Sequence, residues 1–367
     1  MRAKLGEIFE ISSGGTPSKS HPEYYGGNIP WVKTGDLKKE YLDEVENYIT
    51  EEGLNNSSAK MYEADTVLIA MYGATIGATS ILKMNACTNQ ACAAFKKSEQ
   101  VIPEYLYFFL RSQKEKFVKD GVGGAQPNIS VGYLKKVKME IPSLNEQKVI
   151  VDVLDQISDV IVKRNQEILS LEELIRARFV EMFGDPIENP KGWEFVTIGD
   201  VVTEVRYGTS KPAVEGGKYP YLRMNNLTVD GHLDLHDLKY IDISDDEIEK
   251  CVVRKGDVLF NRTNSIELVG KTAVFDLSED MVIAGYIIRV RLNEKILPEV
   301  FAQFMNLEVL KKILRSMAKG AVNQANINAQ ELQRIKVYLP EMKLQKQFIE
   351  MKEQVDKSKF HTEENII

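Results

Sequence analysis

Side chains that can form paired hydrogen bonds gather in short, glycine-containing loops in both halves of the chain. Arginine or lysine suits the edge of guanine, asparagine or glutamine suits adenine, and threonine or serine serves either base. In the first half the candidates are Lys33, Thr34, Asp36, Tyr72, Gly124, Gln126 and Asn128. In the second half they are Arg206, Tyr207, Arg223, Asn225, Asn226, Asn261, Arg262, Thr263, Asn264, Gln324 and Asn326. These residue types predict contacts with DNA bases, and the glycines would let the backbone approach phosphates closely.

The placement of these loops carries more weight than their composition. Asparagine, glycine and threonine are ordinary turn residues, so a single loop of this kind indicates little. Here the loops follow predicted strands at matching positions of the two halves. The two halves differ most in these loops and share their framework residues. Two domains that recognise different short DNA sequences would need this combination.

Motifs with the spacing of a catalytic site are missing from the sequence. Gly270-Lys271-Thr272 ends like a phosphate loop, but Ser265 stands where such a loop needs a glycine. Asn189-Pro190-Lys191 begins like an amino-methyltransferase motif, but it lacks the second proline and the aromatic residue. No Gly-x-Ser-x-Gly elbow is present. We therefore expect a chain that performs no catalysis of its own.

Histidines and cysteines give no metal or disulfide pattern. His232 and His236 are four residues apart in a segment that alternates like a strand, which holds them too far apart for easy chelation. Cys87, Cys92 and Cys251 form no Cys-x-x-Cys pair, so we expect reduced thiols. The sequence predicts no metal and no cofactor in this chain.

An internal repeat with a period of about 190–198 residues organises the chain. Residues 29–33, Ile-Pro-Trp-Val-Lys, match residues 219–223, Tyr-Pro-Tyr-Leu-Arg. Residues 126–130, Gln-Pro-Asn-Ile-Ser, match residues 324–328, Gln-Ala-Asn-Ile-Asn. Because several such blocks are collinear, we interpret the chain as a duplication.

Each half has the pattern of an α+β domain. Short alternating apolar segments are separated by turn signals such as Gly14-Gly15-Thr16-Pro17. A helix is expected over 103–119 in the first half and over 298–319 in the second, each with a proline in its first turn. A glycine- and asparagine-rich loop and one more strand then follow.

A long helix is expected after each half. Residues 145–183 contain no proline and no glycine, and would form a rod of roughly 58 Å. The apolar residues recur in steps of three and four and indicate a coiled-coil seam. In the first helix they are Ile150, Leu154, Ile157, Ile161, Ile168, Leu171 and Ile175. In the second, shorter helix they are Leu344, Phe348, Met351 and Val355.

Four segments follow from these patterns. They are a recognition domain at 1–142, a central spacer helix at 143–186, a second recognition domain at 187–340 and a distal helix at 341–367. The net charge of the chain is −7, which is unusual for a DNA-binding protein, but residues 143–190 alone carry −5. No apolar run is long enough to span a membrane, and no signal segment is visible, so we expect a cytoplasmic protein without membrane contact.

The whole chain resembles the specificity subunits of type I restriction–modification systems. The resemblance rests on the Leu-Gly-Glu start, on Gly14-Gly15-Thr16-Pro17-Ser18 and on Ile29-Pro30-Trp31-Val32-Lys33-Thr34-Gly35-Asp36. It extends to residues 124–130 and to Glu181-Met182-Phe183-Gly184-Asp185-Pro186, after the first long helix. Each motif is weak alone, but together with the duplication they are specific.

The resemblance implies a division of labour among subunits. Each recognition domain would read one half of a bipartite site on double-stranded DNA. The two helices would pair as an antiparallel coiled coil that fixes the unread gap and docks two modification subunits. Those subunits would methylate adenine with S-adenosylmethionine, flipping the base out of the helix. Restriction subunits would add translocation and cleavage that depend on ATP and magnesium.

Three other readings remain open at the level of sequence. The chain could serve a related fused nuclease–methyltransferase system, which the neighbouring genes would reveal. It could be a coiled-coil scaffold that binds only protein, which fits the acidic charge. It could be a methyltransferase in its own right, but the required motifs are missing.

Overall fold

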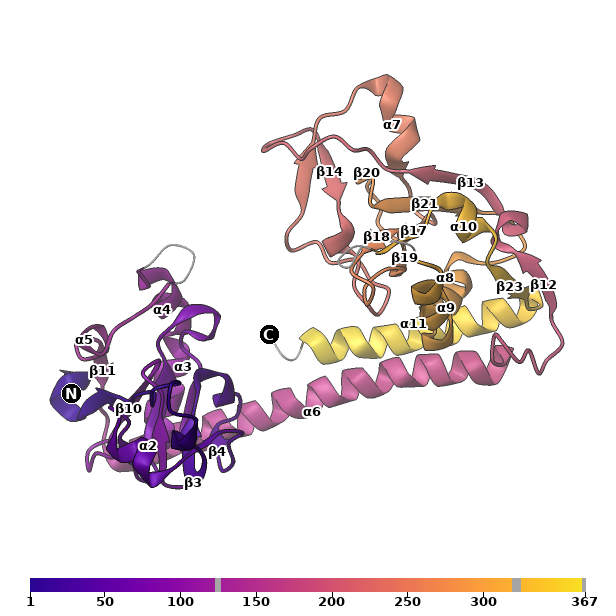
Figure 1. Cartoon of the computed structure of the whole chain (residues 1–367). Helices are drawn as coiled ribbons and strands as arrows, with labels where there is room; N and C mark the ends of the chain where they lie inside the picture. Colours follow the sequence, from indigo (N-terminus) through magenta and orange to yellow (C-terminus); the bar gives the residue numbers. More distant parts are fainter. Residues whose placement is uncertain (123–126, 319–324, 365–367) are drawn as a thin grey trace. The chain divides into compact units, whose positions relative to one another are not determined.

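The computed structural model describes residues 1–122, 127–318 and 325–364. The chain divides into two compact units, Met1–Val162 (unit 1) and Lys163–Ile367 (unit 2) (Figure 1). Both units combine mixed sheets with short helices, which confirms the predicted α+β class. Within the described ranges, no helix is both long enough and apolar enough to cross a bilayer.

Two larger sheets and one strand pair make up the described part of unit 1. The first sheet has the order β2 (Ile11–Ser13), β10 (Cys92–Phe95), β7 (Val67–Ala70), β8 (Thr79–Leu82), β4 (Tyr41–Leu42). The second has the order β5 (Tyr48–Ile49), β3 (Tyr25–Val32), β9 (Ala86–Thr88), β6 (Met61–Tyr62). The pair is β1 (Arg2–Lys4) with β11 (Lys138–Glu140). Both sheets are mixed, because β4 runs parallel to β8 and β3 runs parallel to β9.

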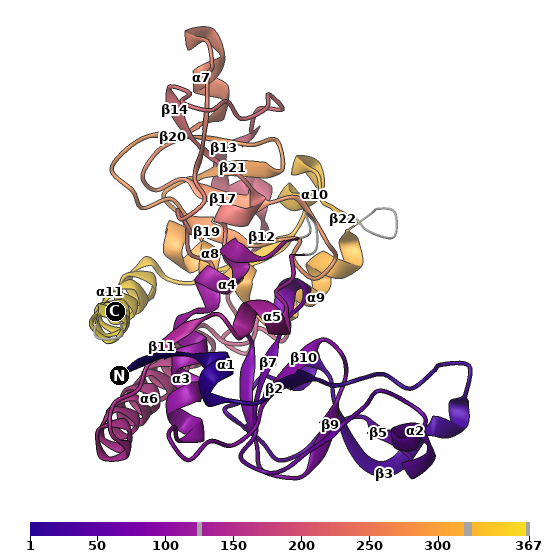
Figure 2. The ribbon, with the colours of Figure 1, turned by 90° about the vertical axis from the view of Figure 1, so that its left-hand side faces the viewer.

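The helices of unit 1 are short. They are α1 (Leu5–Ile8), α2 (Glu51–Asn55), α3 (Pro103–Ser112), α4 (Lys114–Asp120) and α5 (Val131–Leu134), with 3₁₀ turns η1 (Pro22–Tyr24), η2 (Thr34–Asp36) and η3 (Gly73–Thr75). α3 covers β7 and β8, whereas α2 lies with β3 at the other end of the unit (Figure 2). The single helix expected over 103–119 is wrong in one respect: it breaks at Gln113, whose ψ is 0°.

Unit 2 repeats this plan with four groups of strands. One sheet has the order β13 (Val202–Tyr207), β21 (Ile287–Leu292), β17 (Val258–Asn261), β19 (Thr272–Val274). Another has the order β15 (Lys239–Ile241), β14 (Tyr219–Leu222), β20 (Met281–Ile283), β16 (Val252–Val253). The strand pairs are β12 (Glu194–Thr197) with β23 (Lys336–Leu339) and β18 (Thr263–Asn264) with β22 (Ala325–Asn326).

The short helices of unit 2 are α7 (Asp245–Cys251), α8 (Pro298–Asn306), α9 (Glu308–Met317) and α10 (Ala329–Gln333), with turns η4 (Ile198–Val201) and η5 (Met224–Asn226). The helix expected over 298–319 also breaks. Leu307 adopts an extended conformation, with ψ 139°, and its side chain is buried in the core. The break therefore coincides with a buried apolar side chain, whose removal from water is favourable.

The two units share their strand register as well as their element order. In unit 1, Ala94 of β10 faces Leu68 of β7. In unit 2, Arg289 of β21 faces Leu259 of β17. The neighbouring strand continues the correspondence, because Ala94 pairs with Ser12 and Arg289 pairs with Arg206. The duplication read from the sequence therefore holds residue by residue along these strands, and counterparts there can be compared directly.

A buried glutamine joins each long helix to its unit in the same way. These helices are α6 (Leu144–Phe183) and α11 (Met342–Glu364). The side chain of Gln147 donates to Gln100 O at 2.8 Å and to Pro142 O at 3.0 Å, and accepts from Ile102 N at 3.0 Å. Gln345, 198 residues later, bonds in the same pattern to the backbone of Lys295, Pro340 and Leu297.

Within unit 2, the last part of α6 and α11 pack side by side and run antiparallel (Figure 1). The ring of Phe348 lies 5.2 Å from that of Phe179 and 5.6 Å from that of Phe183. Eleven residues after Phe348 on α11, Lys359 donates to Glu172 of α6 at 3.1 Å. Because Glu172 comes before Phe179 in the sequence, the two helices run in opposite directions. This confirms the antiparallel pairing for the segment in unit 2.

The predicted seam residues do not share one environment. Ile175, Phe348 and Val355 are buried, and Leu171, Leu344 and Met351 are half-buried against the same cluster. Ile161, Ile168 and Leu154 are half-buried, whereas Ile150 and Ile157, in unit 1, are exposed by 38% and 50%. The fully buried Phe179 and Phe183 were absent from the predicted seam. α6 ends after Phe183, where Gly184 adopts a φ of +87°.

Candidate nucleic-acid interface

Four chain segments of unit 2 meet at one edge of its sheets. Because antiparallel neighbours reverse direction, the ends of β13 and β17 lie beside the start of β21. The segment before β21 is bonded to the others: Ala284 N donates to Leu222 O at 2.9 Å and Gly285 N donates to Thr209 O at 2.7 Å. Arg262 N donates to Tyr286 O at 2.9 Å. We call the side chains presented here the polar edge of unit 2: Tyr207, Arg223, Arg262 and Tyr286.

A glycine makes this meeting of strands possible in each unit. A Cβ atom on Gly208 would lie 2.2 Å from Ile283 O. Its counterpart in unit 1, Gly14, would place a Cβ atom 2.0 Å from Thr88 O. Any side chain at either position would force the strands apart, so glycine is required by close backbone approach.

Arg262 and Tyr207, both predicted from the sequence, are in contact. The guanidinium of Arg262 lies 4.9 Å from the centre of the Tyr207 ring, and its Nη1 donates to Gly285 O at 3.2 Å. The Tyr207 hydroxyl accepts a hydrogen bond from Ala329 N at 2.8 Å. Tyr207 remains 43% exposed, so the pair forms part of the surface.

Several other predicted residues build this edge from the inside. Asn261 is fully buried, and its side-chain nitrogen donates to Thr263 O at 3.2 Å and Tyr286 O at 3.1 Å. Its side-chain oxygen accepts from Asn264 Nδ2 at 2.9 Å. The buried Thr263 hydroxyl bonds to Asn326 Oδ1 at 3.0 Å. These side chains are occupied by framework bonds, and we do not propose that Asn261 or Thr263 touches a base.

Asp36 and Asn226 close equivalent turns. Lys33 N donates to Asp36 Oδ2 at 2.8 Å, and Arg223 N donates to Asn226 Oδ1 at 2.9 Å. Asn226 is buried and also donates to Asp234 O at 2.8 Å. These two side chains act as caps of η2 and η5, whereas Thr34 is half-buried and Asn225 is exposed on the same turns.

The cations beside these caps are held by acceptors. Lys33 Nζ lies 4.9 Å from the Trp31 ring and donates to Asn47 Oδ1 at 2.6 Å. Arg223 donates to the Asp237 carboxylate at 2.7 Å. Lys33 and Arg223 are half-buried, so each presents a positive group on a braced side chain.

The corresponding edge of unit 1, which we call the polar edge of unit 1, presents Thr16, Tyr72, Gln90 and Asn128. Tyr72 is 44% exposed and forms a bridge with the exposed Asn128, as Thr263 pairs with Asn326 in unit 2. Thr16 donates to the exposed Gln90. Gly124, Gln126 and Gln324, which the sequence analysis also selected, lie outside the described residues.

Sequence reasoning missed Gln90 and Tyr286. Tyr286 is 48% exposed and lies immediately before β21. Gln90 lies in the equivalent connection before β10. A signal was available for Gln90, because Thr88, Asn89 and Gln90 separate two apolar runs, but Tyr286 lies in an apolar stretch that only Gly285 interrupts.

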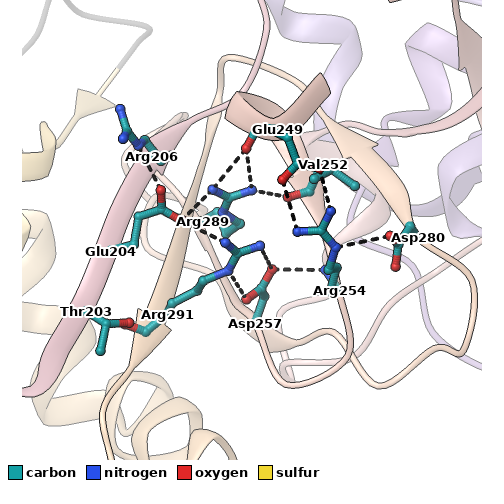
Figure 3. A network of polar contacts seen from close by, with 10 residues as sticks. All are labelled: Thr203, Glu204, Arg206, Glu249, Val252, Arg254, Asp257, Asp280, Arg289 and Arg291. Atoms are coloured by element: carbon teal, nitrogen blue, oxygen red, sulfur yellow. Dashed lines mark hydrogen bonds and ion pairs between the residues drawn. The ribbon is translucent and has the colours of Figure 1, made fainter. Parts of the chain in front are cut away.

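Arg206 belongs to a network of arginines and carboxylates that spans the sheet (Figure 3). Its Nε donates to Glu204 Oε1 at 3.0 Å. The other oxygen of Glu204 accepts from Arg289 at 2.7 Å and from Arg291 at 2.9 Å. Burial raises the pKa of Glu204, but the three arginines outweigh it and hold the pKa below its usual value. Arg206 is therefore the exposed end of a largely internal structure.

The rest of the network anchors α7 to the sheet. Arg289 is completely buried and donates to Val252 O, just after α7. Arg291 Nε donates to Asp257 Oδ1 at 2.8 Å, and Arg254 bonds to Glu249 at 2.7 Å and to Asp280 at 3.2 Å. In unit 1 the counterpart of Arg289 is Ala94, so the buried arginine is specific to unit 2. The Glu204–Arg291 pair, in contrast, has a counterpart in Glu10 and Lys96, 2.9 Å apart.

The described residues contain no cluster of histidines, cysteines and carboxylates that could hold a metal ion. Cys87, Cys92 and Cys251 are all buried free thiols. Burial raises the pKa of Cys87 to about 12, so this thiol stays protonated at neutral pH.

Residues 1–173 and 190–367 both match the family described as "Type I restriction modification DNA specificity domain". The chain belongs to this family. Its two specificity domains correspond to the two units that carry the equivalent polar edges, which confirms the resemblance recognised in the sequence.

Curated relatives are named as specificity subunits of type I restriction enzymes. The chain is 31% identical over 248 residues to the type I restriction enzyme MjaIX specificity subunit of Methanocaldococcus jannaschii, a match covering 61% of this chain and 57% of that protein. It is 22% identical over 355 residues to the EcoKI specificity subunit of Escherichia coli, covering 89% and 75%. The chain matches 57% of the MjaIX subunit and 46% of the EcoR124I/EcoR124II specificity subunit of Escherichia coli, and so spans about half the length of these two relatives.

A solved structure from a study of type I restriction–modification complex assembly and conformational transition has the same fold. The match covers 100% of this chain and 93% of that one, with a TM-score of 0.62 and 17% identity. At this identity, the likeness bears on the fold of the specificity domains alone.

Proposed function

We propose that this chain is the DNA specificity subunit of a type I restriction–modification complex, and that each unit reads one half of a bipartite site on double-stranded DNA. One observation carries the proposal: two copies of a DNA specificity domain present equivalent polar edges with different side chains. Because the frameworks are equivalent, the side chains of each edge reach DNA in the same way. Because these side chains differ, the two units would recognise different half-site sequences.

The long helices would set the spacing between half-sites and dock modification subunits. Within unit 1, α3 and α6 line an apolar groove of about 500 Å³, formed mainly by Tyr105, Phe108, Phe109, Leu154 and Ile157. Counterparts in unit 2 support docking here: Val355, the counterpart of Ile157, is buried against α6, whereas Ile157 is half exposed.

Arg111 also lines this groove, but the carboxylates beside it are more numerous and favour a basic partner. Burial raises the pKa of Asp155, and the nearby carboxylates of Glu104, Asp152 and Asp159 raise it further. A helix with an apolar seam flanked by lysine or arginine would relieve this crowding. We therefore assign the groove to a basic amphipathic helix of a modification subunit.

Catalysis would lie in the partner subunits. In this proposal, modification subunits use S-adenosylmethionine to methylate adenine, and restriction subunits use ATP and magnesium. This chain supplies sequence recognition and performs no chemistry of its own. The complex would act in the cytoplasm, where its DNA substrate is found. The acidic balance of the chain fits this arrangement, because the partners can provide part of the attraction to phosphates.

The test is to map methylated adenines genome-wide in cells with and without this chain, together with footprinting of the complex formed with the modification subunit. We expect methylation at a split sequence with a fixed gap, lost when the chain is deleted. Methylation unchanged by the deletion, or a footprint without sequence preference, would refute the proposal.

A further inference from the structure

Arg262 is held in one orientation before any ligand binds. The ring of Tyr207 supports one face of the guanidinium at 4.9 Å, and Gly285 O accepts from Nη1 at 3.2 Å. The backbone on either side is fixed, because Arg262 N donates to Tyr286 O and Arg262 O accepts from Ile327 N, both at 2.9 Å. A side chain that normally has many rotamers therefore loses little freedom on binding.

The guanidinium of Arg262 keeps unused donors. An arginine has five N–H donors, and the described residues account for one of them, on Nη1. Its Nε is buried without an acceptor. Nearby cations differ: Arg206, Arg223 and Lys211 are each paired with a carboxylate, whereas Arg262 has no such partner among the described residues. Its charge and part of its hydrogen-bonding capacity thus remain for a ligand.

Unit 1 has no equivalent of this arrangement. The same backbone bond that links Ile327 N to Arg262 O links Ile129 N to Met71 O at 3.0 Å, so Met71 is the counterpart of Arg262. Met71 is apolar and only 2% exposed. The strand register makes Ser13 the counterpart of Tyr207. The stacked arginine is thus a property of one unit.

We infer that Arg262, supported by Tyr207, is a specificity-determining residue that reads a guanine in the half-site of unit 2, an inference that rests on the proposed function. The chemistry required is a pair of acceptors in the plane of a fixed arginine, as guanine O6 and N7 provide. Two phosphate oxygens offer a similar pair, but they would bind every sequence equally. Tyr207 acts as a positioning residue, since it orients the guanidinium.

The test uses the complete complex with its modification subunit and a library of randomised half-sites. Arg262→Lys retains the charge but loses the planar fork. We expect it to lower discrimination at a single G·C pair in one half-site by roughly 10- to 100-fold and to leave the other half-site unchanged. Tyr207→Leu should lower discrimination at the same G·C pair. Tyr207→Phe, which keeps the ring, should retain most of that discrimination.

Arg315→Lys is the matched control, because Arg315 lies on α9 and is paired with Glu308. It should bind like the parent complex, and melting temperatures should show that all variants are folded. If Arg262→Lys lowered affinity equally for all sequences and left its salt dependence unchanged, because lysine keeps the charge, Arg262 would be assigned to a phosphate and the inference would be overturned. The inference would also be overturned if Arg262→Lys changed discrimination at an A·T pair, changed it in both half-sites, or changed it at no position. If the parent complex itself shows no split preference, the proposed function fails instead.

Discussion

Two buried lysines in unit 2 have no carboxylate partner in the described part of the chain. Lys271 donates to Met224 O at 2.7 Å and also to Leu227 O, and Lys311 donates to Asn306 Oδ1 at 2.7 Å and to Gly270 O. Burial, with a smaller contribution from the nearby Arg315, lowers the pKa of Lys311 to about 7. The Gly270-Lys271-Thr272 triplet is thus an internal brace.

Lys311 should make the stability of the protein depend on pH. Between its folded pKa of about 7 and its unfolded value near 10.5, the unfolded chain binds the extra proton, so stability rises with pH across this window. Lys311→Met removes this contribution. We expect the difference in unfolding free energy between parent and variant to change by about 2 kcal/mol between pH 7 and pH 9 in urea titrations. Parallel pH profiles would contradict the assignment.

Residue types at the polar edges could be predicted from sequence, but side-chain direction could not. Arg262 and Asn261 are adjacent and both polar, yet Arg262 lies on the Tyr207 ring and Asn261 is fully buried. The difference arises from strand alternation combined with the carbonyl groups that Asn261 happens to meet. Those carbonyl groups come from Thr263 and Tyr286, and their convergence depends on tertiary structure.

At the scale of elements, the helix pair in unit 2 depends on one aromatic cluster. Phe348 is completely buried between Phe179 and Phe183. We expect Phe348→Ala to lower the free energy of unfolding by about 3–5 kcal/mol, through lost burial and the cavity left behind. Leu169→Ala is the control, because Leu169 lies on α6 and is 61% exposed. Equal losses for the two variants, measured by denaturant unfolding, would show that the pair does not stabilise unit 2.

The long helices themselves were predictable, but their contact face was predictable only in part. A seven-residue pattern continued past Ile175 leads to Met182, whereas the buried positions are Phe179 and Phe183. Each step of four turns the buried face by about 40° around a straight helix, so Ile175, Phe179 and Phe183 depart from the line of a seven-residue seam. α6 turns this face toward the core of unit 2, and the contact with a domain core is invisible in a helical repeat alone.

At the scale of the whole molecule, binding of a modification subunit should depend on the apolar groove of unit 1. Ile157→Asp places a charge in that groove and adds to an acidic surrounding. We expect affinity for the modification subunit to fall at least about 10-fold by calorimetry, with little change in stability because Ile157 is half exposed. Val118→Asp, on exposed α4, should bind normally. If Ile157→Asp bound the modification subunit normally, the groove of unit 1 would not be the docking site.

The paired glutamines, Gln147 and Gln345, have a consequence for how such chains can change. Each fixes the start of its helix to its own unit through one side chain and three backbone atoms, and the geometry is the same in both copies. A joint built from backbone atoms makes few demands on the rest of the unit's sequence. Recombination at this joint could therefore attach the recognition unit of another chain to an existing helix. The hybrid would recognise a new DNA sequence after a single genetic event.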